Sequence, residues 1–261
     1  MSNPEIIDLN GLEPALDAQE PEIDEQEPDQ VENIQSNNIK LVSSKELLDI
    51  LTFHTFLFGK SGSGKTFLAN HGFKNIPYTA IFFNTLGLRE IRSNGIEVKS
   101  TKHLDQMLLE DMFFKKNNKI IISKGFSEDV EDYAVRIMPI IKKIERLQTK
   151  KYANGINRPI FIFVDEIQLL DTKEFKKKIR NIALTGRNFQ LFGVFISQRA
   201  QIVDKSIMTQ CNALIGYLEN FDVEYFHRQH IDLPIIEEHS NKFYFLNNKQ
   251  LIKLDITKGA N

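Results

Sequence analysis

Short apolar runs alternate with longer amphipathic stretches along the chain from residue 40 onward. The apolar runs predict β-strands at 55–58, 78–84, 119–123, 159–164, 191–197 and 212–218. Stretches with apolar residues at helical spacing predict helices at 64–73, 101–115, 127–150 and 172–185. We expect Pro139 to kink or interrupt the third of these helices. Residues 242–256 resemble a hairpin that turns at Asn247–Asn248.

This alternation of strands and helices predicts the fold class. Strands that are separated by helices pair in parallel through crossover connections. The runs at 159–164 and 191–197 are apolar throughout, which is typical of central strands that helices cover on both faces. We therefore predict an α/β fold with a mostly parallel central sheet flanked by helices, plus a C-terminal hairpin.

The segment GKSGSGKT, residues 59–66, follows the first of these strands and matches the phosphate-binding pattern G-x-x-x-x-G-K-[ST] at every required position. Glycines let such a loop wrap an anion with its backbone N–H groups, and the helix that follows adds its N-terminal dipole. Lys65 would reach the β- and γ-phosphates, and the Thr66 hydroxyl would bind Mg²⁺. The predicted phosphate cradle consists of Gly59, Lys60, Ser61, Gly62, Ser63, Gly64, Lys65 and Thr66.

Two adjacent carboxylates, Asp165 and Glu166, end the apolar run RPIFIFV. A buried parallel strand would deliver Asp165 to the carboxyl edge of the sheet, beside the phosphate loop, where it can hold Mg²⁺ through water. Glu166 would then polarise the attacking water. The predicted cofactors are ATP and Mg²⁺, and the predicted reaction is Mg²⁺-dependent ATP hydrolysis.

Further polar residues surround the strand predicted at 191–197. Gln198 follows this strand directly, and its side chain could face the γ-phosphate. Arg187, Arg199 and Arg180 are the candidate arginines, because an arginine of one subunit can complete the nucleotide site of a neighbour in a ring.

The segments FIFVDEIQLL and TGRNFQLFGVFISQRAQIVDKSIMTQCNALI together resemble the FtsK–HerA superfamily of DNA-pumping ATPases. Members show DE, then GR before an apolar strand, then SQRP and a CN pair. The matching residues are Asp165, Glu166, Gly186, Arg187, Ser197, Gln198, Arg199, Cys211 and Asn212. Ala200 departs from the usual proline, and the resemblance covers residues 50 to 220 approximately.

This resemblance implies a RecA-like P-loop fold of the additional-strand catalytic-glutamate type. The phosphate-loop strand would lie between the strands that carry Asp165 and Gln198, or close to them. The resemblance also implies a ring, commonly a hexamer, around double-stranded DNA. Gln198 would sense the γ-phosphate and Arg187 would act on a neighbouring subunit, so the expected catalytic residues are Glu166, Gln198, Arg187 and Lys65.

No accessory domain of the kinds found in several family members is expected within these 261 residues, and a nearly bare motor of this kind is most similar to the genome-packaging ATPases of double jelly-roll, internal-membrane viruses. Capsid or vertex proteins are then expected partners. Two alternatives stay open: a HerA-like or conjugation-type DNA pump of a mobile element, and a non-motor nucleotide switch like ParA or MinD. Lys60 occupies the place of the second lysine of the ParA/MinD class, whereas Glu166 argues against that class.

Charge is distributed unevenly along the chain. Residues 1–35 hold 11 Asp and Glu and no Lys or Arg, which leaves 33 basic and 24 acidic residues in 36–261. The first segment has few large apolar groups, so we predict an acidic disordered tail over 1–36 and an ATPase motor domain over 37–261. The tail could solubilise the chain, tether a basic partner, or compete with DNA. Lysine-rich stretches at 173–180 and 113–119 are candidate DNA contacts.

Cysteine content and hydropathy indicate the compartment. The single cysteine, Cys211, excludes an intramolecular disulfide and fits a reducing environment. No apolar run approaches the roughly 20 residues that a membrane helix needs. The expectation is a cytoplasmic protein without an integral membrane segment, located in the host cytoplasm or associated with the virion if the chain is viral.

Overall fold

The structure is a computed structural model that describes residues 39–41, 44–98, 101–109, 117–170, 172–202, 210–229, 231, 233, 242–247 and 250–255. All of them belong to one compact unit, Ser36–Asn261. The predicted acidic tail, 1–36, lies outside the described residues, as does most of the lysine-rich stretch at 113–119. No helix in the described ranges combines the length and the apolar character needed to span a bilayer.

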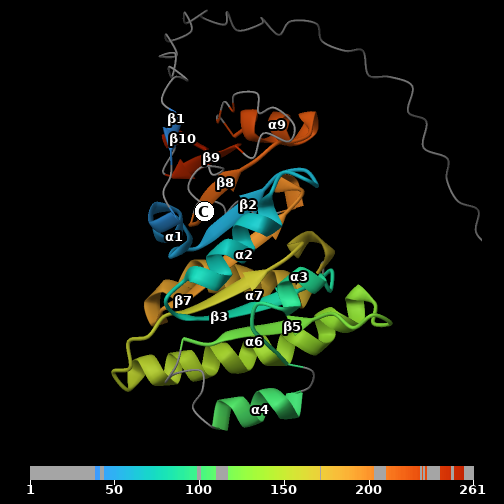
Figure 1. Cartoon of the computed structure of the whole chain (residues 1–261), viewed down its shortest axis with the longest axis vertical. Helices are drawn as coiled ribbons and strands as arrows, with labels where there is room; N and C mark the ends of the chain where they lie inside the picture. The colour runs from blue at the N-terminus through green and yellow to red at the C-terminus, as the bar shows by residue number, and fades with distance from the viewer. Residues whose placement is uncertain are drawn as a thin grey trace, which may run out of the picture. The chain divides into compact units, whose positions relative to one another are not determined.

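Ten strands of the described residues form one sheet in the order β1-β10-β9-β8-β2-β7-β6-β3-β5-β4. Their bounds are β1 Ile39–Leu41, β2 Thr55–Phe58, β3 Thr79–Asn84, β4 Ile96–Glu97, β5 Lys119–Ser123, β6 Ile160–Val164, β7 Leu191–Ser197, β8 Asn212–Ile215, β9 Lys242–Asn247 and β10 Gln250–Asp255. The strands from β8 to β4 pair in parallel, whereas β9 pairs antiparallel with both β8 and β10. The predicted mostly parallel sheet and its C-terminal hairpin are thus confirmed (Figure 1).

Parallel pairing gives this sheet two chemically different edges. The seven parallel strands all end on one side, called here the carboxyl edge, and all begin on the other, the amino edge. The loops that follow β2, β6 and β7 therefore meet at the carboxyl edge, where ligands bind in open α/β sheets.

Helices cover both faces of the sheet (Figure 1). Their bounds are α1 Ser44–Leu51, α2 Lys65–Asn75, α3 Arg89–Arg92, α4 Thr101–Leu109, α6 Val130–Ala153, α7 Lys173–Thr185 and α9 Asn220–His227, with single turns η1 Ile167–Leu169, η2 Gly186–Phe189 and η3 Ala200–Ile202. Alternate residues of β2 enter two separate cores. Phe56 and Phe58 pack in the core that includes α6 and α7, and Leu57 packs in the core that includes α1 and α2. This two-sided burial explains why the central strands are apolar at every position.

The predicted strands agree with the structure to within one residue, except that β8 ends at Ile215 instead of residue 218. Helix α6 continues through Pro139, so the predicted interruption was wrong. Proline removes one backbone hydrogen bond, to the carbonyl of Val135. Both Val135 and Pro139 lie on the exposed side of α6, where water can bind that carbonyl instead.

Candidate functional site

The phosphate loop joins β2 to α2, as its sequence predicts. Gly64 caps α2 with φ of 86°, and Gly59 has φ of 149°. Both values lie in the region that favours glycine. A Cβ on Gly59 would also lie 2.6 Å from the Ser63 hydroxyl oxygen and 3.1 Å from the Tyr217 carbonyl oxygen, so a side chain there would displace Ser63. The loop therefore keeps the compact form that backbone binding of phosphate requires.

Lys65 is buried in the first turn of α2, with only 4% of its surface exposed. Its Nζ donates a hydrogen bond to the Lys60 carbonyl at 2.9 Å, across the mouth of the loop. Burial lowers the pKa of Lys65, while the charges of Glu166 and Asp165 raise it. The lysine and the two acids, a hundred residues apart in sequence, thus share one electrostatic site.

Asp165 follows β6 and is completely buried. Its backbone N–H donates to the Phe83 carbonyl at 3.1 Å, which holds the residue in line with the sheet. Neither of its carboxylate oxygens has a hydrogen-bond partner in the described part of the chain. Burial and the neighbouring charge of Glu166 raise the pKa of Asp165 to about 7. An ionised carboxylate that is buried without hydrogen bonds is costly in free energy unless a cation lies beside it.

Mg²⁺ fits this arrangement. It is usually bound by one or two carboxylates together with water and substrate phosphates, so a dense cluster of protein ligands is not required. Among the described residues there is indeed no group of three or more His, Cys, Asp or Glu with metal-ligand placement. The buried Ser63 hydroxyl also lacks a partner there, so the site holds more than one polar group that a bound ligand could satisfy.

Glu166 is held in a definite position by two amides. It has a left-handed backbone, with φ of 45° and ψ of 55°, which costs on the order of 1 kcal/mol in a residue other than glycine. Its side chain accepts a hydrogen bond from Gln198 Nε2 at 2.7 Å and a second one from Gln168 Nε2. Gln168 was not predicted from the sequence, because its place two residues after Glu166 does not by itself mark a contact.

Gln198 follows β7, and β7 lies between β2 and β6 in the sheet. The prediction that the phosphate-loop strand lies between the strands that carry Asp165 and Gln198 was therefore wrong. Strand β2 borders the strand that carries Gln198 and is only close to the strand that carries Asp165. The inserted strand is β7 itself, as the additional-strand fold type requires. Its position places Gln198 between the phosphate loop and the two acids.

The candidate arginines occupy different parts of the fold. Arg187 is in η2, ahead of β7, and therefore at the amino edge. There it is exposed, donates a hydrogen bond to the Gln210 carbonyl, and lies near His54. Arg199 pairs with Glu219 at 3.2 Å and lies over the Phe221 ring at 4.1 Å. Arg180 is exposed on α7. Arg187 therefore lies away from the phosphate loop of its own chain, whereas Arg199 directly follows Gln198 at the carboxyl edge.

The segment after β8 contacts the phosphate loop. No role was predicted for this segment from the sequence. The Lys60 N–H donates to the Tyr217 carbonyl at 2.6 Å, and Lys60 Nζ lies 5.7 Å from the centre of the Tyr217 ring. The buried Asp222 accepts a hydrogen bond from the Ala200 N–H at 3.1 Å. This segment thus links the phosphate loop to the residues that follow Gln198.

Comparison with known proteins shows which fold this is. No protein-family model and no curated protein matches the chain. Among solved structures, the genome packaging NTPase B204 from Sulfolobus turreted icosahedral virus 2, in complex with AMPPCP, matches with a TM-score of 0.54 and 14% identity over 78% of this chain and 97% of that chain. VirB4 of Thermoanaerobacter pseudethanolicus matches with a TM-score of 0.55 and 12% identity over 78% of this chain and 89% of that chain.

The cytoplasmic domain of the Type VII secretion ATPase EccC from Thermomonospora curvata also matches, with a TM-score of 0.51 and 12% identity, over 77% of this chain and 23% of that chain. At identities this low, the structural matches show a shared fold and no more. The matches confirm the predicted P-loop ATPase fold, and the likeness to packaging ATPases is a likeness in fold.

Proposed function

We propose that the chain is a Mg²⁺-dependent ATPase that moves double-stranded DNA, and that it packages a viral genome into a preformed capsid. The observation that carries the proposal is the meeting of three groups at the carboxyl edge. Lys65 lies in a phosphate loop, Asp165 is buried without a partner among the described residues, and two amides orient Glu166.

Each of these residues has a defined task in hydrolysis. The loop amides and Lys65 bind and orient the phosphates of ATP. Thr66 and Asp165 would hold Mg²⁺, which supplies charge neutralisation at the phosphates when bound. Glu166 accepts a proton from the attacking water as a general base. Gln198 already contacts Glu166, so its amide can respond to the γ-phosphate and change how that base is held.

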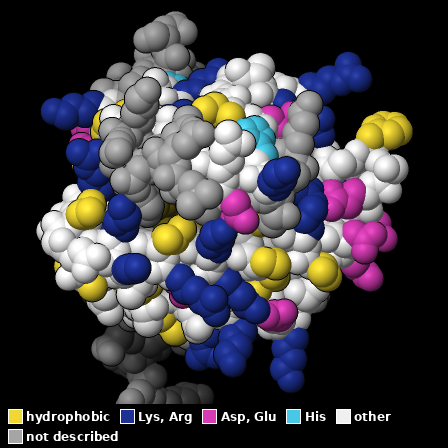
Figure 2. All heavy atoms as spheres, turned by 90° about the horizontal axis from the view of Figure 1, so that it is seen from below, with side chains coloured by type: hydrophobic (Ala, Val, Ile, Leu, Met, Phe, Trp, Pro, Cys, Tyr) yellow, Lys and Arg dark blue, Asp and Glu magenta, His cyan; other side chains and the backbone are white. Residues whose placement is uncertain are grey.

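A basic surface supports DNA as the second ligand. Residues 142–146 of α6 hold three basic residues and one acidic residue. Residues 173–180 of α7 hold five basic residues and one acidic residue. The pairs Lys142–Glu174 and Lys178–Glu145 place these two stretches side by side. Figure 2 shows lysine and arginine side chains gathered on the face that is seen from below Figure 1. Such a surface suits phosphate contacts that do not depend on base sequence.

Arg187 supports a ring of subunits. Because it lies at the amino edge, its guanidinium belongs to the side of the chain opposite the phosphate loop. It would complete a nucleotide site only by reaching the carboxyl edge of a neighbouring copy. A hexamer is the assembly implied by the family resemblance, with capsid or vertex proteins as further partners in packaging.

The decisive experiment measures ATP hydrolysis by the full chain with and without long double-stranded DNA. We expect DNA to stimulate hydrolysis severalfold. Glu166→Gln should lower the rate by orders of magnitude while nucleotide binding persists, and Glu224→Gln, an exposed glutamate on α9, should leave it unchanged. Hydrolysis that is slow and indifferent to DNA length would favour a ParA-like nucleotide switch instead.

DNA contact is tested separately. The double substitution Lys176→Gln and Lys177→Gln should weaken binding of duplexes of any sequence and reduce the dependence of affinity on salt. Lys74→Gln, an exposed lysine on α2, is the matched control. Unchanged affinity in the double variant would remove α7 from the DNA-binding surface.

A DNA pump of a mobile element is the second candidate. It is favoured by the observation that VirB4 shares the fold to the same extent as the packaging NTPase. Both candidates use the same chemistry, so gene neighbours, a capsid protein or a relaxase, distinguish them.

A further inference from the structure

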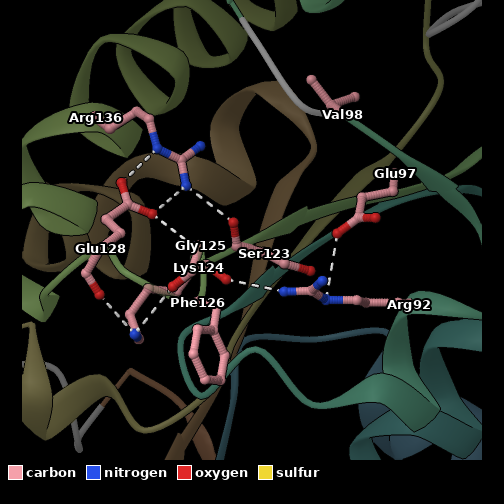
Figure 3. A pocket seen from close by; sticks show the side chains of 9 residues that line it. All are labelled: Arg92, Glu97, Val98, Ser123, Lys124, Gly125, Phe126, Glu128 and Arg136. Carbon is pink, nitrogen blue, oxygen red and sulfur yellow. Dashed lines mark hydrogen bonds and ion pairs between the residues drawn. The ribbon is translucent and has the colours of Figure 1, made fainter.

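The loop between β5 and α6, residues 124–129, presents an exposed aromatic side chain at the carboxyl edge. Phe126 exposes 106% of the reference surface for phenylalanine, so no part of its ring is covered within the described chain. The loop borders a pocket of about 340 Å³ that is lined by Arg92, Glu97, Val98, Ser123, Lys124, Gly125, Phe126, Glu128 and Arg136 (Figure 3). Solvent exposure of a whole phenyl ring is unfavourable, because it leaves a large apolar area in contact with water.

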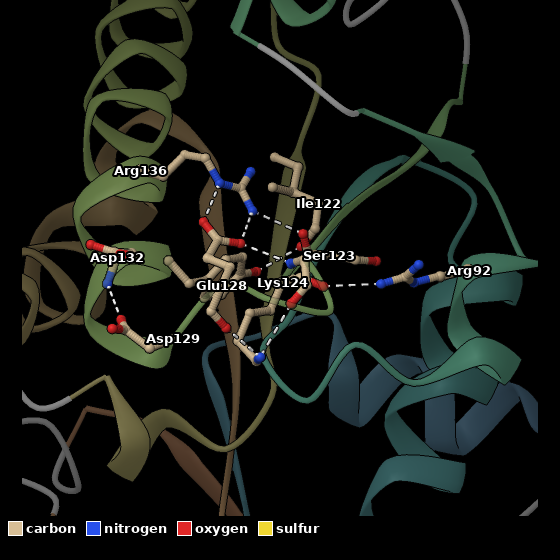
Figure 4. A network of polar contacts seen from close by, with 10 residues as sticks. Arg92, Ile122, Ser123, Lys124, Glu128, Asp129, Asp132 and Arg136 are labelled. Atoms are coloured by element: carbon tan, nitrogen blue, oxygen red, sulfur yellow. Dashed lines mark hydrogen bonds and ion pairs between the residues drawn. The ribbon is translucent and has the colours of Figure 1, made fainter.

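A dense hydrogen-bond network holds this loop in one conformation (Figure 4). Arg136 binds both carboxylate oxygens of Glu128, at 2.7 and 2.8 Å, and the Ser123 carbonyl at 2.9 Å. The pair with Arg136 also lowers the pKa of Glu128. Glu128 in turn accepts from the Gly125 N–H at 2.8 Å, and Lys124 Nζ donates to the Glu128 carbonyl at 2.7 Å.

Rigidity and exposure together are characteristic of a binding anchor. An aromatic ring on a preorganised loop loses little conformational entropy when a partner covers it, and such rings dominate the energetics of interfaces. The ring is therefore placed for contact with another molecule.

The charge around Phe126 identifies the chemistry of that molecule. Residues 125–132 contain four acidic residues and no basic one. Asp129, Glu131 and Asp132 are exposed. Lys124 and Arg136 also border the loop, but both are bound to Glu128 within it, so Asp129, Glu131 and Asp132 make up its exposed charge. A fitting partner offers apolar side chains bordered by basic ones.

The amino edge of this chain carries a matching surface. Residues 146–164, the end of α6 and the approach to β6, contain four basic residues and no acidic one. Tyr152 and Ile156 in this stretch are exposed to 38% and 36%, and Lys150 and Arg158 lie beside them in sequence and are also exposed. The complementary surfaces lie on opposite edges, so two copies would join head to tail.

We propose that the Phe126 loop of one copy binds residues 150–158 of a second copy, and that this contact assembles the ring. The proposal deepens the proposed function, because it names the surfaces through which the motor subunits would join. A head-to-tail contact also turns the amino edge of one copy, which carries Arg187, toward the carboxyl edge of the next.

The test uses the oligomeric state of the full chain, measured by light scattering after size-exclusion chromatography. Wild type should assemble beyond the dimer. Phe126→Ala should raise the dissociation constant at least tenfold. The combined change Lys150→Glu and Ile156→Ser, at the opposite surface, should do the same. Val223→Ala, an exposed apolar residue of α9, is the control and should assemble as wild type does.

Mixing the two defective proteins gives the sharpest outcome. Each retains the surface that the other lacks, so a head-to-tail contact predicts a one-to-one dimer from two monomeric samples. A mixture that stays monomeric, a wild type that never assembles, or a Phe126→Ala protein that assembles normally would each overturn the proposal. Binding of a fluorescent ATP analogue should persist in every variant, and failure of the wild type to bind it would count against the proposed function rather than this interface.

Discussion

Replacing Asp165 by asparagine should stabilise the protein while abolishing hydrolysis. The carboxylate is completely buried without a partner in the described residues, and its pKa is raised to about 7 from an ordinary value of 3.8. The folded chain therefore holds a proton on Asp165 at pH values where the unfolded chain has released it. Because the unfolded state binds fewer protons between these two pKa values, stability falls as pH rises through this window.

The size of the effect follows from the shift. A difference of about three pKa units corresponds to about 4 kcal/mol lost above pH 7, at 1.36 kcal/mol for each unit. Asparagine has nearly the same shape as aspartic acid and no charge. The Asp165→Asn protein should therefore recover a large part of this unfolding free energy at pH 8, and little of it at pH 4. Mg²⁺ with a non-hydrolysable ATP analogue should stabilise wild type and not the variant, because the carboxylate is the predicted metal ligand.

Urea denaturation at a series of pH values measures this directly. The quantity to follow is the difference in unfolding free energy between variant and wild type, because other titrating groups contribute equally to both. The slopes with respect to urea should agree, so that the midpoints report stability alone. This prediction would be refuted if the difference in unfolding free energy did not grow between pH 4 and pH 8, or if wild type were the more stable protein at pH 8. Asp165 would then not be a buried carboxylate that requires a bound cation.

Three further predictions concern the amino edge of the sheet, the support of Glu166 and the phosphate loop. His54 is buried, its Nδ1 accepts a hydrogen bond from the Gly193 N–H at 3.0 Å, and burial lowers its pKa to about 4. The free energy of unfolding should therefore fall as pH drops from 6.5 toward 4. His54→Asn, which keeps a hydrogen-bond acceptor, should flatten this pH dependence in thermal unfolding. Gln168→Leu removes one of the two amides on Glu166 and should lower kcat about tenfold or more with little change in ATP affinity; an unchanged kcat in steady-state assays would leave Gln168 without a part in catalysis. Gly59→Ala should abolish nucleotide binding in a fluorescence titration, because its Cβ would meet Ser63 Oγ at 2.6 Å, whereas Gly155→Ala, with positive φ but open space around it, should cost only about 1 kcal/mol of stability and bind nucleotide normally.

Local chemistry in the sequence was enough to predict many elements of this protein. The phosphate loop is contiguous, so its glycines, Lys65 and Thr66 could be identified from spacing alone. The strands around it were predictable because two-sided burial makes them apolar at every position. The paired acids could be found for the same reason, since a carboxylate directly after such a run is unusual unless a ligand stabilises it.

Other features depend on contacts between segments that are distant in the chain. Spacing does not reveal that Gln168 and Gln198 hold Glu166, since one lies 2 and the other 32 residues away and neither distance marks a contact. The place of β7 between β2 and β6 is likewise decided by pairing across the whole sheet. Pro139 shows the same limit, because the helix tolerates it only where tertiary packing leaves that side of α6 exposed to water.

The sequence by itself predicted the candidate residues for binding phosphate, holding a metal and activating water, because each of these tasks requires a particular side chain directly after a particular strand or in the loop and helix that follow it. Only the tertiary structure decided that Arg187 lies at the edge away from its own phosphate loop and that Phe126 is left uncovered. The physical reason is that the chemistry of a side chain is local, whereas its burial and its neighbours depend on how the whole sheet is ordered.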